Sequence, residues 1–394
     1  MIRKKWMGLA LLVALSLAIC GCSAAEQTVQ PGDEQENEGE QPTLLLWASG
    51  EALGYDAAVR AMQEQHGILV EFAAIAETDE EEILKELSAG RSDYDLVQIE
   101  YSFGHPYSAD EFARNGYFLP LEAEVVRKAV DCMWPCLQEL AVNGDEVMLL
   151  PMSARPYVLY TWGELSVKDW DELVQMEGFL ERDEVLWACL LEQYMLDYDQ
   201  DGFAFDCDAF LQTLELAKRA YGTEREYGLG VDIPYVSLGA EAQIERVSLT
   251  AYETRGTRLG WLPSMDGKWR IPVKVSALAI PAGAPHAEAA QTFMAELAAI
   301  GLYGDSEALK QGRPFGGVDT QNCYDEDAHI ACAVGDDGNN LNRWRQIMRS
   351  ARVMPEAGLL TSCWIEDIQP YFADEITAQE CARRMQQKLE QQGR

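Results

Sequence analysis

The alternation of short apolar runs with helical patterns near the start of the chain constrains the fold more than any other feature. Apolar runs at 44–48, 69–75 and 95–99 are typical of buried strands, and the stretches 57–62 and 80–87 have helical periodicity. Strands that alternate with helices at this spacing favour right-handed βαβ units in a parallel sheet. The sequence therefore predicts an α/β fold.

Polar residues stand where two of these predicted strands end. Ser49 and Glu51 follow the first apolar run, and Glu100 and Tyr101 follow the third. Ligands of open α/β sheets bind outside the carboxyl ends of the strands. We therefore expect these four residues to lie beside a ligand.

Residues 1–22 have the features of an export signal. Three basic residues at 3–5 precede an uncharged stretch at 6–19. That stretch is shorter than the roughly 18 residues that cross a bilayer, so a secretory signal is favoured over a membrane span.

The end of this segment resembles a bacterial lipobox, in which an aliphatic and a small residue precede a cysteine that receives a lipid. Cys22 fits best, because Gly21 precedes it and Ile19 stands at the aliphatic position. Cys20 is the second choice, since Ile19 would then occupy the small-residue position. The alternative is an ordinary cleaved signal peptide. The resemblance implies a mature chain held on the extracytoplasmic side of the cell membrane by a palmitate-type lipid.

The segment after the lipobox and the whole chain are both acidic. Residues 23–42 are rich in Glu, Gln and Gly, and all their charges are negative. Such a segment buries too little apolar surface to fold, and its like charges extend it, so we expect a flexible stalk. The 394-residue chain has a formal net charge of −35. Such a surface repels nucleic acid and anionic lipid, so neither is an expected partner.

Ten cysteines occur, and two of them belong to the signal segment. Export permits disulfides, and the pairs Cys132–Cys136 and Cys323–Cys332 are close enough in sequence to consider. Buried free thiols are the alternative, because a body of this size needs no disulfides. No Cys-x-x-Cys pair occurs, so thioredoxin-like and zinc-ribbon patterns are excluded.

The later part of the chain is mostly helical in pattern. A proline-punctuated extended stretch at 146–162 is typical of a crossover between domains, and a second apolar extended run lies at 274–281. Helical periodicity marks the segments 170–176, 184–196, 208–220, 286–297, 340–350, 365–372 and 377–391. The roughly 350 residues after the stalk suffice for two domains of about 100–200 residues.

An ordered set of segments spread over the mature chain carries a family resemblance. These segments are 46–50, 93–97, 115–121, 150–160, 170–173, 260–267, 277–281, 288–294 and 377–382. Together they resemble the extracellular solute-binding proteins of ABC importers, the family that includes maltose-binding protein. One departure is that Thr161–Glu164 leads almost directly into the next helix, which shortens part of the usual rim of the second lobe.

The resemblance implies a type II periplasmic-binding-protein fold. Two α/β lobes are joined by strands that cross between them twice, and a ligand cleft lies at the hinge. Lobe 1 is expected at 43–152 plus about 275–335. Lobe 2, with C-terminal helices packed at the hinge, is expected at 153–274 plus about 336–394.

Aromatic and polar residues are the candidate ligand contacts. Sugar rings stack their apolar C–H faces on Trp and Tyr, while carboxylates and amides accept their hydroxyl protons. The aromatic candidates, expected in loops or at strand ends, are Trp47, Tyr101, Tyr157, Trp261, Trp269 and Trp364. The polar candidates are Ser49, Glu51, Glu100 and Asp266. The alternatives are core packing for the aromatic residues and a solvated surface for the acids.

One stretch also matches the spacing of a calcium loop. Asp197, Asp199, Asp201 and Asp208 stand at positions 1, 3, 5 and 12, with Gly202 at position 6. Position 12 of such a loop normally holds a bidentate Glu, so a plain Asp/Gly turn is the alternative. The spacing predicts a stabilising calcium site, and no cofactor is expected to be required.

Enzyme functions find little support in the sequence. No His-Glu-x-x-His or Gly-x-Ser-x-Gly motif occurs. A lipid-anchored glycoside hydrolase needs only paired acids, and a surface lipoprotein that recognises a partner protein is a third class. The resemblance implies instead a monomeric, non-enzymatic binding protein. It would capture a small solute, with a saccharide as the leading class, and deliver it to an ABC permease.

Overall fold

The computed structural model describes most of the chain after the acidic segment. The described residues are 42–48, 55–74, 80–101, 116–162, 169–175, 183–198, 204–221, 236–239, 257–260, 263, 270–303, 346–354 and 357–391. The predicted export signal, Cys22 and the predicted stalk up to residue 41 lie outside them. Within the described part of the chain, no helix is long and apolar enough to span a membrane.

The first sheet begins with the predicted βαβ pattern. Strand β1 (Thr43–Ala48) pairs in parallel with β2 (Leu69–Ala74) on one side and with β3 (Leu96–Tyr101) on the other. The first connection contains α1 (Asp56–Ala61), which continues into the short π-helix η1 (Met62–His66). The second contains α2 (Glu80–Ser88). Gly67 ends the first connection in a left-handed conformation, which glycine adopts at little cost. The predicted parallel units are confirmed.

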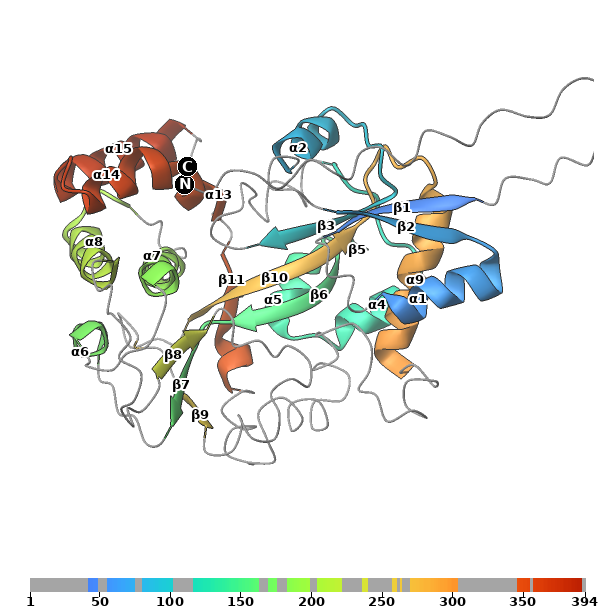
Figure 1. Cartoon of the computed structure of the whole chain (residues 1–394), viewed down its shortest axis with the longest axis horizontal. Helices are drawn as coiled ribbons and strands as arrows, with labels where there is room; N and C mark the ends of the chain where they lie inside the picture. The colour runs from blue at the N-terminus through green and yellow to red at the C-terminus, as the bar shows by residue number, and fades with distance from the viewer. Residues whose placement is uncertain are drawn as a thin grey trace, which may run out of the picture. The chain divides into compact units, whose positions relative to one another are not determined.

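Distant parts of the chain complete this sheet (Figure 1). The nine-residue strand β10 (Ile271–Ala279) is antiparallel to β3 and to β6 (Leu150–Pro156), and the short β11 (Ala351–Val353) is parallel to β10. The path through the sheet is β11-β10-β3-β1-β2, with β6 on β10. Almost every residue of β10 is buried, because this strand has neighbouring strands on both edges and side chains packed on both faces.

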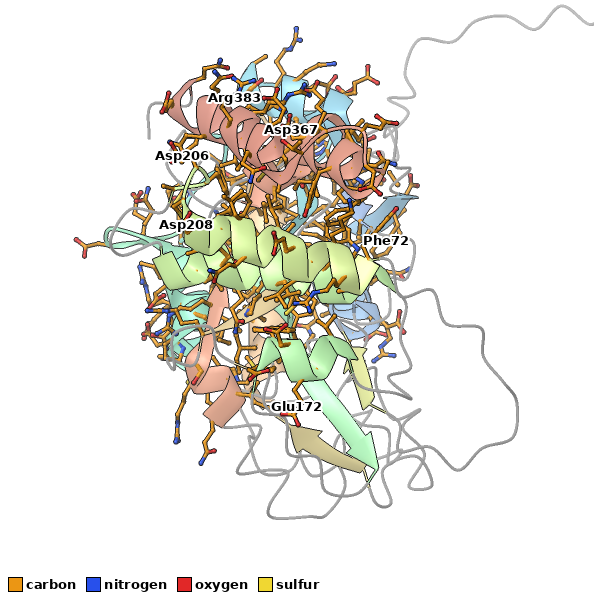
Figure 2. All side chains as sticks on the ribbon, turned by 90° about the vertical axis from the view of Figure 1, so that its left-hand side faces the viewer. Phe72, Glu172, Asp206, Asp208, Asp367 and Arg383 are labelled. Atoms are coloured by element: carbon orange, nitrogen blue, oxygen red, sulfur yellow. The ribbon has the colours of Figure 1, made fainter. Side chains whose placement is uncertain are left out.

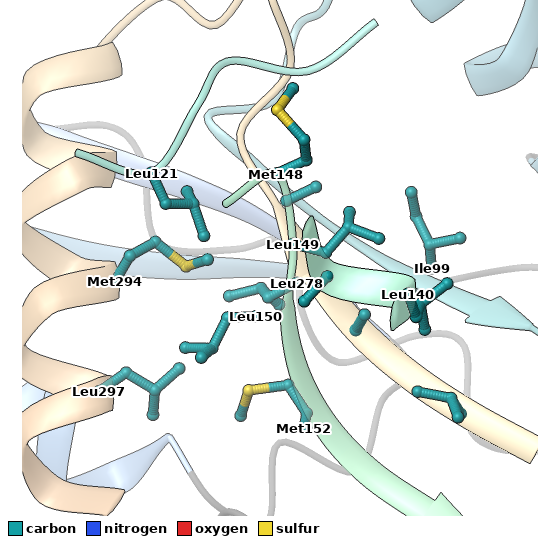
Figure 3. Close-up of a cluster of buried hydrophobic side chains, with 14 of the residues drawn as sticks. Ile99, Leu121, Leu140, Met148, Leu149, Leu150, Met152, Leu278, Met294 and Leu297 are labelled. Atoms are coloured by element: carbon teal, nitrogen blue, oxygen red, sulfur yellow. The ribbon is translucent and has the colours of Figure 1, made fainter. Parts of the chain in front are cut away.

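Helices α4 (Glu124–Asp131), α5 (Pro135–Ala141) and α9 (Ala287–Tyr303) pack around this sheet to form a first hydrophobic core. In its interior Leu150 points toward Met294 and Leu297 of α9, and Leu149 points to the other side, toward Ile99 and Leu140 (Figure 3). A buried carboxylate connects helix α9 to the sheet. Asp95 accepts hydrogen bonds from the backbone amides of Leu45 in β1 and of His286, which precedes α9, at 2.8 and 2.6 Å. The second of these satisfies an amide at the start of α9.

A second core is built almost wholly from helices. Its elements are α6 (Trp170–Gln175), α7 (Asp183–Tyr198), α8 (Asp208–Tyr221), α13 (Ala357–Cys363), the wide turn η4 (Trp364–Ile368), α14 (Gln369–Phe372) and α15 (Ala378–Gln391). Figure 2 looks onto these helices, with Asp208 at one end of α8 and Arg383 on α15. Phe210 lies at the centre of an aromatic group, 4.9 Å from Tyr194 and 4.8 Å from Phe205 between ring centroids.

Two small sheets accompany the cores. Strand β7 (Val158–Trp162) lies between β8 (Val236–Gly239) and β9 (Thr257–Gly260) and is antiparallel to both. Strands β4 (Val142–Asn143) and β5 (Glu146–Val147) form a hairpin.

The chain passes between the two cores at specific points. Ala154 belongs to the first core and Tyr157 to the second. At this crossing the Tyr157 amide donates to the Pro272 carbonyl at 3.0 Å, and Gln193 Nε2 of α7 donates to the Arg270 carbonyl at 3.4 Å. The backbone at the start of β10 is therefore hydrogen-bonded to two residues of the second core region. The lobe boundaries given above stay a prediction.

The two alternatives for the cysteines were disulfides and free thiols. The cysteines that the structure describes are free thiols. Cys132 and Cys136 are not bridged, although their spacing allowed a disulfide. Cys136 is buried in the first core, and burial raises the pKa of its thiol to about 12. Its thiol therefore behaves as a small apolar group. Cys323 and Cys332 lie outside the described residues.

Candidate functional site

A row of polar side chains crosses the otherwise apolar centre of the first sheet. Strands β3 and β10 bring Gln98 opposite Leu278 and Glu100 opposite Ser276, and Lys274 is two residues from Ser276 along β10. Directly opposite residues of an antiparallel pair project to the same face. We refer to Gln98, Glu100, Lys274 and Ser276 as the polar row. Gln98 and Ser276 are buried, and the two charged residues are partly exposed.

Each end of the polar row has a strong polar contact. Lys274 Nζ lies 2.6 Å from Glu100 Oε2, with the two side chains 27% and 22% exposed. Further into the sheet, the Tyr55 hydroxyl donates to Gln98 Oε1 at 3.1 Å. Burial raises the pKa of Tyr55 well above its usual value, so its hydroxyl stays a donor at neutral pH. The row thus offers carboxylate, amide, hydroxyl and ammonium groups on one face.

The second core contains an aromatic cluster formed by Trp187, Tyr221, Trp364 and Phe372. Trp364 stacks on Trp187 with ring centroids 4.2 Å apart and planes at 14°. Phe372 meets Trp187 edge-on at 5.7 Å, and Tyr221 lies 4.7 Å from Phe372. Trp187 is fully buried, whereas Trp364 and Tyr221 are half-buried. Ile365, the next residue after Trp364, is 70% exposed. This end of η4 is therefore at the surface.

The structure places several predicted contacts inside the cores. Trp47 lies within β1 and Tyr101 within β3, and both are buried in the first core. Glu100 and Tyr101 were expected after the third strand, but β3 extends to include both, because Tyr101 pairs with Val275 of β10. Tyr157 is buried in the second core. A role for these aromatic side chains in ligand contact stays a prediction.

Trp364 was expected in a loop or at a strand end, and that placement is wrong. Helix α13 runs directly into η4, so Trp364 stands on a helical surface. The helical periodicity that begins at Ile365 extends back through Trp364, since stacking on Trp187 gives that residue an apolar partner on the core side. Its assignment as a ligand contact is unaffected and untested.

Most of the other predicted site residues lie outside the described residues. Ser49, Glu51, Trp261, Asp266 and Trp269 are outside, as are Asp199 and Asp201 of the predicted calcium loop. Of the remaining two calcium candidates, Asp197 falls within α7 and Asp208 is exposed at the start of α8. No group of three metal-ligating side chains occurs where the structure describes the chain. The calcium site stays a prediction.

Sequence reasoning missed Lys274, Gln98, Ser276 and Trp187. A signal for Lys274 was present, because it is the one charged residue in the apolar run Ile271–Ala279. A lone charge inside a buried strand needs a partner. The signal did not identify Glu100 as that partner, since the two residues are far apart in sequence. Trp187 gave no signal, because an aromatic residue in an apolar helix is typical of core packing.

Comparison with known proteins identifies the fold. No protein-family model matches the sequence, and no curated protein sequence matches it. Solved structures do match, and among them are solute-binding proteins of ABC transporters. The chain therefore has the fold of these proteins, which confirms the predicted two-lobe type II α/β class.

Three of these structures illustrate the likeness. The GacH receptor of Streptomyces glaucescens, solved unliganded and in complex with acarbose, matches with a TM-score of 0.64 at 13% identity, covering 89% of this chain and 98% of its own. Maltose-bound MalE3 of T. maritima gives 0.63 at 14%, covering 88% and 99%. A Thermotoga lettingae protein bound to α-D-tagatose gives 0.61 at 16%, covering 88% and 98%. At such identities the likeness is one of fold.

Proposed function

We propose that this chain is a lipid-anchored extracellular substrate-binding protein that captures a small saccharide and delivers it to an ABC permease. One observation carries the proposal: the fold matches sugar-complexed solute-binding proteins over almost their whole length. The protein would perform no chemistry itself. Binding would favour a closed form of the two lobes, because the solute has higher affinity for that form, and the permease would recognise it.

The described residues supply the two kinds of group that a saccharide needs. In the aromatic cluster, Trp187 covers one face of Trp364, and the half-buried Trp364 is left near the surface. A sugar ring can stack on such an indole through its C–H groups. The polar row adds the Glu100 carboxylate and the Gln98 amide as acceptors for hydroxyl protons. Each kind of group is one that saccharide-binding sites use.

Removing the Trp364 ring is expected to weaken saccharide binding at least about fivefold, because stacked aromatic contacts and their burial contribute roughly 1–3 kcal/mol. A thermal-shift screen of residues 43–394 against mono- and oligosaccharides, polyamines, amino acids and calcium identifies the solute. Titration calorimetry then compares wild type with Trp364→Ala. Trp134→Ala is the matched control, since Trp134 is also half-buried but packs on the first core.

Each arm of the screen has a defined meaning. A shift with one saccharide family that Trp364→Ala reduces supports the proposal, because a ligand that binds only the folded state raises its stability. No shift with any solute, from a cooperatively folding protein, would favour the alternative of a lipoprotein that recognises a partner protein. Hydrolysis of an oligosaccharide would favour a lipid-anchored glycoside hydrolase. No effect of calcium after chelation would exclude the predicted calcium site.

The lipid anchor has its own test. Cys22→Ala is expected to move the protein from the membrane fraction to the soluble extracytoplasmic fraction, because the thiol that would receive the lipid is lost. Cys20→Ala is the matched control and should leave the protein in the membrane fraction. Fractionation and immunoblotting of cells that express each variant measure the effect. Membrane retention of Cys22→Ala together with release of Cys20→Ala would assign the lipid to Cys20 instead.

A further inference from the structure

The ion pair of the polar row gives the site a charge selectivity. We propose that Lys274 is a specificity-determining residue that compensates Glu100 and thereby keeps cationic solutes out of the binding site. The inference rests on the proposed function, since it takes Glu100 as a contact of the bound solute. Lys274 acts through Glu100 and is therefore a positioning residue.

The two charges come from adjacent strands of the sheet, and Arg155 of β6 stands opposite Lys274 on its other edge. Glu100 is the only charged residue of β3 and Lys274 the only one of β10. Their side chains are about three-quarters covered, and their charged atoms are 2.6 Å apart. A charge at such depth is costly unless it is paired. The contact therefore fixes the position of the Glu100 carboxylate beside the Lys274 ammonium group.

The pair stands where the chain passes from one core to the other. Lys274 is two residues beyond Pro272, whose carbonyl accepts the Tyr157 amide at the crossing. In register, Lys274 lies opposite Arg155 of β6, the residue before Pro156, at which that strand ends. The type II fold places its solute at the hinge between the lobes, so the pair is close to the crossing that the proposed function uses.

The net negative charge of the whole protein attracts cations, so the pairing of Glu100 with Lys274 affects which solutes bind. The formal net charge is −35, and such an excess concentrates cations near the surface. A partly exposed carboxylate near the hinge would then favour a polyamine or an amino sugar. With an ammonium group 2.6 Å away, an approaching cation meets repulsion that offsets this attraction. The carboxylate still accepts hydrogen bonds from neutral hydroxyls, so an uncharged polyol is retained.

Lys274→Met tests the inference, because methionine keeps a flexible apolar side chain and removes the charge. Titration calorimetry at low ionic strength measures binding of spermidine and glucosamine as cationic probes and of maltose as a neutral one. We expect Lys274→Met to bind spermidine at least about tenfold more tightly than wild type does. Its affinity for glucosamine should also be higher than that of wild type. Lys274→Arg should keep the wild-type preference, since guanidinium also pairs with a carboxylate.

Lys128→Met is the matched control, because Lys128 pairs with Glu124 at 2.9 Å on an exposed helix surface. It should leave spermidine affinity unchanged. Lys274→Gln gives a second uncharged variant if Lys274→Met does not fold by circular dichroism. Unchanged spermidine affinity in a folded, uncharged variant would overturn the role of Lys274. Failure of wild type to respond to any saccharide, while Lys274→Met gains spermidine binding, would instead count against the saccharide proposal alone.

Discussion

Replacing Phe293 with alanine is expected to lower the free energy of unfolding of the first core by about 3–5 kcal/mol, the usual cost of removing a fully buried phenylalanine. Phe293 of α9 has no exposed surface and lies 6.1 Å from the Tyr55 ring. Its loss leaves a cavity between α9 and α1 that neighbouring side chains fill only in part. Urea denaturation, followed by hydrogen exchange of the β1, β3 and β10 amides, measures the change.

Phe72 provides a matched control for this prediction. Its ring also lies against Tyr55, with centroids 5.8 Å apart, but its side chain is 39% exposed. Phe72→Ala is therefore expected to cost about 1 kcal/mol or less, because little apolar surface is returned to water and no closed cavity forms. Equal losses from the two substitutions would mean that the Tyr55 contact, and not burial, determines the contribution of each ring.

Replacing Lys388 with methionine is expected to destabilise the second core by about 2–4 kcal/mol, because it leaves a buried carboxylate without its cation. Lys388 Nζ lies 2.7 Å from Asp367 Oδ2, and the Asp367 side chain is only 3% exposed. Burial alone would lower the pKa of Lys388, but its ion-pair contacts with the Asp367 and Glu366 carboxylates raise it above its usual value. The charged pair joins α15 to η4. Chemical denaturation followed by near-UV circular dichroism measures the loss.

The same lysine supplies its own control. Lys388 also contacts Glu366 at 2.8 Å, but that carboxylate is 72% exposed. Glu366→Gln should shift the denaturation midpoint little, since water replaces the lost contact. The double variant Lys388→Met with Asp367→Asn should recover part of the stability lost in Lys388→Met, because no buried charge then remains. A double variant no more stable than Lys388→Met would show that packing of the lysine stem accounts for the effect.

Local patterns predicted the elements of this fold better than the contacts between them. The apolar runs that became β1, β2 and β3 were recognisable because each is short, buried and separated by a helical pattern. The start of β10 was expected at Lys274, but the strand begins at Ile271. Pro272 is tolerated near the beginning of the strand, where its carbonyl still accepts a hydrogen bond from the Tyr157 amide.

The candidate site was predictable only in part, because local patterns do not encode contacts between distant segments of the chain. Glu100 was placed correctly near a strand end because that inference needs only the local pattern. Its partner Lys274 is contributed by a strand that inserts beside β3 from a distant part of the sequence. No propensity or spacing encodes such a pairing. Trp364 and Trp187 meet for the same reason, through the packing of η4 on α7.

The sheet of the first core carries a consequence for the order of synthesis. Strand β10 lies between β3 and β6, yet its residues follow the whole of α6, α7 and α8 in the chain. Nascent β3, which ends at Tyr101, therefore waits until the segment from Ile271 to Ala279 has been made before its neighbour β10 exists. Pairings between such distant segments form slowly. A chain whose central sheet cannot be completed early stays unfolded for longer during its synthesis. That delay is compatible with passage through a secretion channel, which accepts a polypeptide only before it has folded.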